Sequence, residues 1–224
     1  MFKINTDKSV ISESAGSSFI NGSGVFDVSV NFASIGVSKS GAEQFVFNLD
    51  YKGSSQTIYG PYYKGTTANG GKFSDISVGL YTTLGVIVGL TDGEQFTTEV
   101  ESHKVGKEQK EVELDVIQEL TDKVIKIQVQ AEFSIYQGKI KENLVLRSFF
   151  REDGASAEEI LNDGEVGKRL AMVEEKYASN VSYKDGITAE QATEWKANKR
   201  SGGSASSVPA AKTTAAKTGS LFKS

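Results

Sequence analysis

The clearest pattern in the chain is a strict alternation of apolar and polar side chains over residues 26–32, with every even position apolar. A period of two is typical of a β-strand that buries one face. The same alternation over 45–51 predicts a second strand, which pairs with the first across the turn at 38–41. Gly53 then allows a turn into a third strand at 56–59.

A helix is predicted after these strands. Beyond a glycine-rich loop at 65–71, apolar residues recur at helical spacing over 76–88, and Ser74 and Asp75 are candidate caps. Residues 92–122 are mostly charged and weakly periodic, which predicts a solvated loop or a hairpin of modest stability.

Alternation returns over 125–136, the longest strand pattern in the chain, and Gln137-Gly138 turns it toward a last strand at 140–150. Three strands, a helix and a hairpin are the element order of an OB-fold, a small five-stranded Greek-key barrel. Several other β-rich barrels share this order. We therefore predict a mainly β fold with added α-helices, built on an OB-like barrel.

Helix-forming residues dominate after Asp153-Gly154. Ser156 with Glu159, and Thr188 with Gln191, fit the capping box, in which two side chains satisfy free backbone amides. Trp195 is expected to anchor a helix by packing. We therefore predict an OB-like barrel at 1–154, a helical extension packed on it at 155–200, and a flexible basic tail with a Leu-Phe tip at 201–224.

Charge is distributed unevenly along the chain. The segment from Trp195 to Ser224 has six Lys or Arg and no acid, whereas residues 1–194 have 19 basic and 29 acidic side chains. A basic end with an apolar tip indicates an interacting appendage. The first residues lack the apolar block of a secretion signal and no run is long enough to span a bilayer, so we expect an intracellular protein.

Catalytic motifs are missing from the sequence. There is no cysteine, His103 is the single histidine, and no Gly-Lys-Ser/Thr phosphate loop occurs. Adjacent acids such as Glu158-Glu159 are interpreted as solvated surface. We expect a protein that is not an enzyme and that has no cofactor or metal.

Aromatic residues interleaved with lysines surround the third strand. Exposed rings stack on any base and lysines follow phosphates, so this combination is typical of single-strand binding. A second group lies on the last strand, where one of Phe149 and Phe150 is expected to face solvent. The candidate DNA-binding residues are Lys39, Tyr51, Lys52, Tyr59, Tyr62, Tyr63, Lys64, Lys72, Phe73, Lys139, Arg147, Phe149 and Arg151.

A structural interpretation of the same residues stays open. Tyrosines are common wall residues of barrels, and Pro61 can simply end an edge strand. The chain is also acidic overall, with a net charge of −4, so a nucleic-acid groove has to concentrate its lysines locally.

Several short motifs together resemble the single-stranded DNA-binding protein of Schitoviridae, the podophages that package their own RNA polymerase. They are residues 23–28, the turn at 38–42, Tyr59-Gly60-Pro61-Tyr62, residues 149–154, Tyr183-Lys184-Asp185-Gly186 with Trp195, and Ser220-Leu221-Phe222-Lys223. The resemblance implies roles in phage DNA replication, recombination and transcription activation, in the cytoplasm of the infected bacterial host. It also implies that Ser220, Leu221, Phe222 and Lys223 recruit a phage RNA polymerase. Bacterial counterparts end on an acidic tail, so docking onto the host's replication partners in their manner is in doubt.

The leading hypothesis is a sequence-tolerant single-stranded DNA-binding protein that recruits a polymerase through its tail. The main alternative is a virion structural or assembly protein, such as a tail or capsid decoration protein, which predicts self-association and no DNA binding. An enzyme acting on nucleic acid needs a metal-binding acid cluster, and the sequence offers none that we can assemble.

Overall fold

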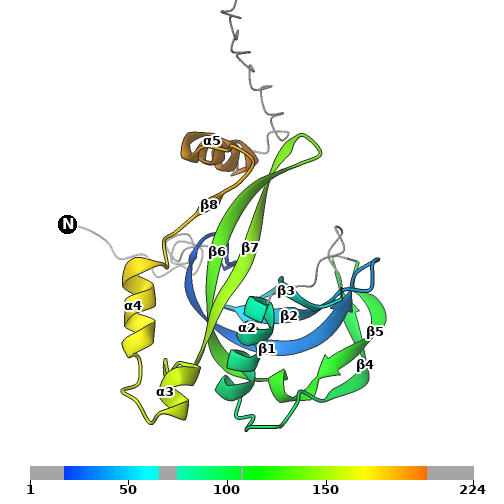
Figure 1. Ribbon diagram of the computed structural model, residues 1–224. Helices are drawn as coiled ribbons and strands as arrows, with labels where there is room; N and C mark the ends of the chain where they lie inside the picture. The colour runs from blue at the N-terminus through cyan, green and yellow to red at the C-terminus, as the bar shows by residue number, and fades with distance from the viewer. Residues whose placement is uncertain (1–17, 66–74, 107, 201–224) are drawn as a thin grey trace, which may run out of the picture. The chain divides into compact units, whose positions relative to one another are not determined.

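A computed structural model describes residues 18–65, 75–106 and 108–200. Within these residues the fold is mainly β, with eight strands in one antiparallel sheet and a few short helices (Figure 1). The elements are β1 (Gly24–Val37), β2 (Glu43–Tyr51), β3 (Ser54–Lys64), α2 (Asp75–Ile87), β4 (Thr98–Val105), β5 (Lys110–Ile117), the 3₁₀ helix η1 (Gln118–Leu120), β6 (Val124–Tyr136), β7 (Lys139–Arg151), α3 (Ala157–Leu161), α4 (Lys168–Lys176), β8 (Ser182–Tyr183) and α5 (Ala189–Arg200).

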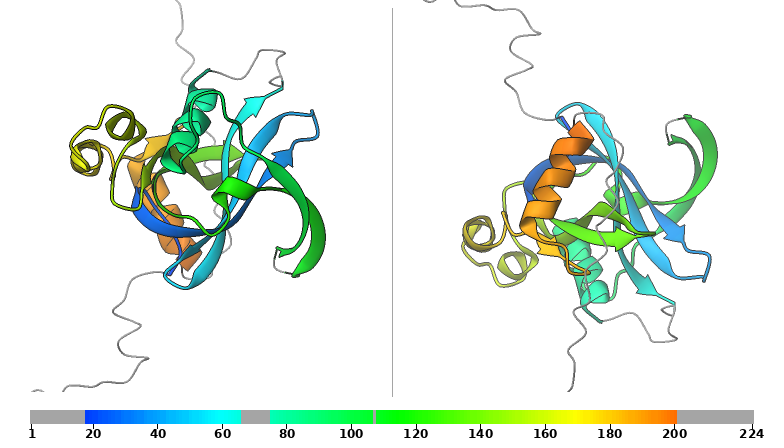
Figure 2. Two further views of the ribbon diagram at one scale, coloured as in Figure 1. Left: turned by 90° about the horizontal axis from the view of Figure 1, so that it is seen from below. Right: turned by 90° about the horizontal axis from the view of Figure 1, so that it is seen from above.

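The predicted strands, the predicted helix after them and the later short helices are all present. Residues 92–122, predicted as a loop or modest hairpin, contain the β4–β5 hairpin, and Figure 2 shows it curving away from the neighbouring strands. The two-residue turns at Lys52-Gly53 and Gln137-Gly138 have positive φ at both positions. That geometry matches the right-handed twist of the strands that it connects.

β1 is the strand around which the sheet is organised. Its first half, from Gly24 to Ser29, pairs with β6, and the stretch from Ser29 to Val37 pairs with β2. The sheet path continues from β3 through β2 and β1 to β5 and β4. One register irregularity interrupts the β1–β2 pairing between Val30 and Phe32.

The chain splits into two compact units. The first unit is residues 1–132 and 143–182, and the second is residues 133–142 and 183–224. Strands β6 and β7 run through both. The hydrophobic core of the first unit contains Phe45, Phe47 and Leu49 of β2, with apolar side chains of β1, β3, β6, β7 and α2.

The second unit has its own aromatic cluster. The ring of Phe133 lies 5.8 Å from Tyr183 and 5.9 Å from Trp195, between ring centroids. Trp195 is buried, as its predicted packing role requires. Lys196 Nζ lies 2.7 Å from Glu142 Oε1, which joins α5 to β7 by an ion pair.

Both predicted capping boxes form. Ser156 Oγ accepts from the Glu159 amide while the Ser156 amide donates to the Glu159 carboxylate. Thr188 and Gln191 exchange the same pair of hydrogen bonds at the start of α5. α3 and α5 therefore begin where their local sequence satisfies free backbone amides.

Candidate nucleic-acid interface

The candidate tyrosines of β2 and β3 divide between two faces of the sheet. Tyr63 lies on the inner face, which faces the core of the first unit, and its ring packs 5.5 Å from Phe45 and 5.3 Å from Tyr81. Tyr51 is half-buried edge-on against Phe26 at 5.4 Å. Tyr59 is 59% exposed on the opposite, outer face. Proximity in the sequence therefore did not translate into one surface.

A bulge in β3 places Tyr59 and Tyr62 on the same face. Val46 of β2 pairs with Tyr59, and Gln44 pairs with Tyr62, so a step of two residues along β2 corresponds to a step of three along β3. Regular alternation puts side chains three positions apart on opposite faces, and the extra residue restores them to one. Pro61, which has no amide to donate, is tolerated at such an irregularity.

Tyr81 of α2 holds this bulge from the inner side. Its hydroxyl donates to the Pro61 carbonyl at 2.7 Å and accepts from the Phe45 amide at 3.2 Å. A Cβ atom at Gly60 would lie only 2.2 Å from the same hydroxyl oxygen, so glycine is required there. Burial raises the pKa of Tyr81, which keeps the hydroxyl neutral and able to donate.

The outer face between these tyrosines and β1 is lined by amides and hydroxyls. Asn48 Oδ1 accepts from Asn31 Nδ2 at 2.8 Å and from the Ser55 hydroxyl at 3.0 Å. Val46 and Gln44 continue the same face along β2, because paired residues of antiparallel strands share a face. The amide and hydroxyl side chains give a base stacked on the tyrosines uncharged hydrogen-bonding neighbours.

Phe32 of β1, paired with Asn48, also lies on the outer side of the sheet, but its ring is buried and only 8% exposed. The alternation at 26–32 predicts that Phe32 is buried, and it is. The irregularity at Asn31 separates it from the core cluster that contains Val30 and Ala33, so its burial comes from other contacts. Phe32 stacks on His103 of β4, with ring centroids 4.0 Å apart. Glu101 Oε2 lies 2.9 Å from His103 Nε2, and hydrogen bonds from Gln118 and His103 lower the pKa of Glu101.

Five residues of this face were not predicted from the sequence: Phe32, Gln44, Val46, Asn48 and His103. Gln44, Val46 and Asn48 alternate with the apolar positions of the second strand, and this alternation could have placed them on its outer face. No local pattern marks Phe32 or His103, because their meeting depends on the bulge and on strands distant in sequence.

The candidate cations near β2 and β3 lie at the strand ends. Lys39 is exposed in the β1–β2 turn, and Lys52 is exposed in the β2–β3 turn with its Nζ 5.1 Å from the Tyr51 ring. Lys64 is paired at 2.8 Å with Glu43, whose carboxylate also accepts from the Tyr63 hydroxyl at 3.0 Å. Burial, with this hydrogen bond, raises the pKa of Tyr63 to about 12.

The group on β7 differs from the prediction. Phe149 and Phe150 are both buried, each 1% exposed, so the expectation that one faces solvent is wrong. Phe149 packs 5.8 Å from Phe47 in the core and has no ring face for a base. Arg147 is exposed and donates to Gln130 at 2.8 Å, and Arg151 binds the Asp153 carboxylate at 2.7 Å.

The remaining candidates are Lys139, Lys72, Phe73 and the segment from Ser220 to Lys223. Lys139 is an exposed residue of the second unit. Lys72, Phe73 and the segment from Ser220 to Lys223 lie outside the described residues. Among the residues that the structure covers, no helix is long and apolar enough to cross a membrane, and no cluster of three or more His, Asp or Glu could hold a metal ion.

Neither a protein-family model nor a curated protein sequence matches this chain.

Proposed function

We propose that the protein binds single-stranded DNA without strong sequence preference on the outer face of β1, β2 and β3. The observation that carries the proposal is the placement of Tyr59 and Tyr62 on one face by the Gly60-Pro61 bulge. A strand bulge re-aims side chains and is often found beside functional sites. Two rings on one face suit two unpaired bases, because every base has a flat apolar face.

The strand pairing supports an OB-like interpretation of the first unit. β1 pairs with β2 on one edge and with β6, the first strand of the later hairpin, on the other. α2 separates the first three strands from those that follow. In OB-folds the face of strands 2 and 3 and the loop between strands 1 and 2 contact oligonucleotides. Tyr59 and Tyr62 lie in β3 and Lys39 in the β1–β2 turn, which supports the proposal.

Electrostatics support contact at the two ends of the face. Lys39 and Lys52 lie in turns at opposite ends of β2, and both are exposed. Cations there neutralise phosphates and release counterions, while amides such as Asn48 face the bases. We propose that the basic segment at 201–224 takes no part in this contact and recruits a phage RNA polymerase through Ser220, Leu221, Phe222 and Lys223. The protein then acts, without catalysis, in replication, recombination and transcription activation in the host cytoplasm.

Titration with fluorescent oligo(dT) at several salt concentrations tests DNA binding. We expect binding at low salt that weakens by a constant slope in log affinity against log salt. Duplex DNA of equal length is the matched control and binds more weakly, because its bases are already stacked. Absence of binding at low salt, together with stable self-association, would instead support a virion component.

Deletion of residues 220–224 tests the division of labour. Oligo(dT) affinity stays nearly unchanged while polymerase recruitment is lost, because the two contacts use different parts of the chain. An equal loss of both would contradict the proposal.

A further inference from the structure

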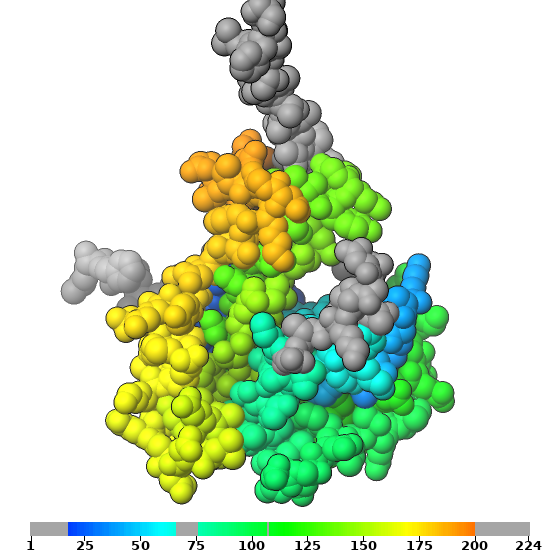
Figure 3. All heavy atoms as spheres, in the orientation of Figure 1, coloured from blue at the N-terminus to red at the C-terminus, as the bar shows by residue number. Residues whose placement is uncertain are grey.

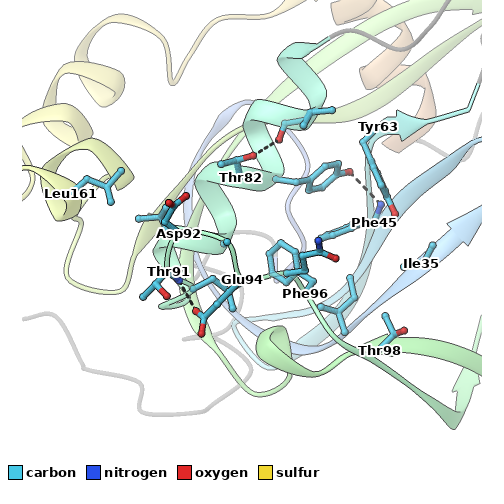
Figure 4. Close-up of a pocket in the computed structure, with 18 residues that line it drawn as sticks. Ile35, Phe45, Tyr63, Thr82, Thr91, Asp92, Glu94, Phe96, Thr98 and Leu161 are labelled. Atoms are coloured by element: carbon cyan, nitrogen blue, oxygen red, sulfur yellow. Dashed lines mark hydrogen bonds between the residues drawn. The ribbon is translucent and has the colours of Figure 1, made fainter.

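A cavity of about 580 Å³ opens on the inner side of the sheet, away from the face proposed for DNA. It lies between α2, the loop at 88–97 and the inner face of β1, β2, β4 and β5, and Figure 4 shows the side chains around it. Its floor is aromatic: Phe45 lies 4.1 Å from Tyr81 and 5.3 Å from Phe96, between ring centroids. A concave apolar site of this size is typical of a ligand pocket.

The mouth of the cavity is also apolar, which is unusual for a surface in contact with water. Val78 on α2 is 47% exposed and Leu161 at the end of α3 is 69% exposed, and both line the cavity. Ile76, about half a turn before Val78 on the same helix, does not line the cavity but is likewise exposed. Exposed apolar side chains gathered next to a pocket indicate a docking site for a protein segment.

Two acidic side chains lie beside these apolar ones at the mouth of the cavity. Asp92 and Glu94 are exposed in the loop after α2, and none of the described residues that line the cavity is Lys or Arg. Glu94 accepts from the Thr91 amide at 2.6 Å, which fixes its carboxylate at the mouth. Figure 3 shows α2 and this loop, coloured turquoise to green, on the face turned toward the viewer. An acidic rim disfavours phosphate and favours a ligand that joins an apolar group to a cation.

We infer that this cavity binds the Leu221-Phe222-Lys223 segment of the chain, with the apolar pair against the aromatic floor and Lys223 beside Asp92 and Glu94. Residues 201–224 contain three lysines and no acid, and Leu221-Phe222 is their one pair of adjacent large apolar side chains. The apolar pair of the segment therefore matches the aromatic floor of the cavity, and the positive charge of Lys223 matches the acids at its mouth. The same residues are proposed above to recruit a polymerase, so the cavity and the polymerase compete for one segment. The inference depends neither on that recruitment nor on DNA binding, which is assigned to the other face of the sheet.

A labelled peptide of residues 212–224 tests this directly, titrated with full-length protein that carries Leu221→Ala and Phe222→Ala, so that its own segment does not compete. We expect saturable binding by fluorescence anisotropy. A peptide with Phe222→Ala binds about tenfold more weakly or worse, because the buried ring supplies most of the apolar contact. No saturable binding, or equal binding of the Phe222→Ala peptide, would overturn the inference.

Variants of the protein locate the site. Gly85→Leu, on the cavity side of α2, fills the space and abolishes peptide binding, and Leu161→Lys, at an exposed position of the mouth, weakens it several-fold without a change to the core. Asp92→Asn with Glu94→Gln reduces affinity about two- to fivefold, as exposed ion pairs do. Glu113→Gln, an exposed acid of β5 outside the lining, is the matched control. Unchanged binding in both Gly85→Leu and Leu161→Lys would place the peptide elsewhere and reject the site.

Discussion

The inner and outer faces of β2 and β3 use alternate residues of the same strands for different purposes. The inner face presents Phe45, Phe47 and Ile58 to the core, and all three are buried. The outer face presents Val46, Asn48 and Tyr59, which are half-buried or exposed. Because neighbours in the sequence lie on opposite faces, a cluster of aromatic residues along one strand is not one surface. Only the register of the strands shows which rings share a face.

The first and largest effect concerns the inner face. Phe47→Ala removes a fully buried ring and is expected to lower the free energy of unfolding by about 3–5 kcal/mol. Urea denaturation, monitored by circular dichroism, measures the free energy of unfolding. The affinity of the folded variant for oligo(dT) stays the same. A lower affinity of the folded variant would contradict the assignment of stability to the inner face and DNA binding to the outer face.

The outer face is tested by Tyr59→Ala together with Tyr62→Ala. Each lost stack costs about 1–3 kcal/mol of binding free energy, so the double variant binds oligo(dT) at least tenfold more weakly. Fluorescence titration at fixed salt gives the affinity. Tyr177→Ala, an exposed tyrosine at the end of α4, is the matched control and leaves binding unchanged. If the double variant keeps the parent affinity, these rings are not the site.

The bulge connects the two faces, and Gly60→Ala perturbs it. The added Cβ atom meets the Tyr81 hydroxyl at 2.2 Å, so the hydroxyl loses its place between Pro61 and Phe45. We expect about 1–3 kcal/mol of lost stability and a parallel loss of oligo(dT) affinity. Gly79→Ala on α2, where a Cβ meets nothing within 4 Å, is the control. Lost stability with full affinity would separate the bulge from the binding face.

The smallest effect is that of Tyr63→Phe, which removes the hydroxyl bonded to Glu43. Stability at neutral pH falls by about 1 kcal/mol. The pKa of Tyr63 is raised from 10.0 to about 12, so between these values the unfolded chain releases a proton that the folded chain keeps. Stability therefore declines as pH rises through this window.

Denaturation at neutral pH and at a pH between the two pKa values measures this dependence. The decline is smaller in Tyr63→Phe than in the parent. An identical decline in Tyr63→Phe would show that this hydroxyl does not titrate as its surroundings imply.

Much of the fold could be predicted from local patterns. Alternation marked the strands, Gln137-Gly138 marked a turn that needs positive φ, and Ser156 and Thr188 marked helix starts. Each of these depends on residues a few positions apart. The placement of the rings was predicted less well. Tyr51, Tyr63 and Phe149 pack against other rings, and Phe32 is buried against His103 instead of in the core cluster.

Local chemistry thus set where strands, turns and helix caps lie, since backbone hydrogen bonding and side-chain periodicity act over short stretches of chain. Packing between distant segments set which rings meet solvent. The irregularities at Asn31 and at Gly60-Pro61 each reverse the alternation, and the second is held by Tyr81 from a helix further along the chain. The alternation along one strand carries no information about that contact. The surface proposed for DNA is therefore defined only in the folded protein.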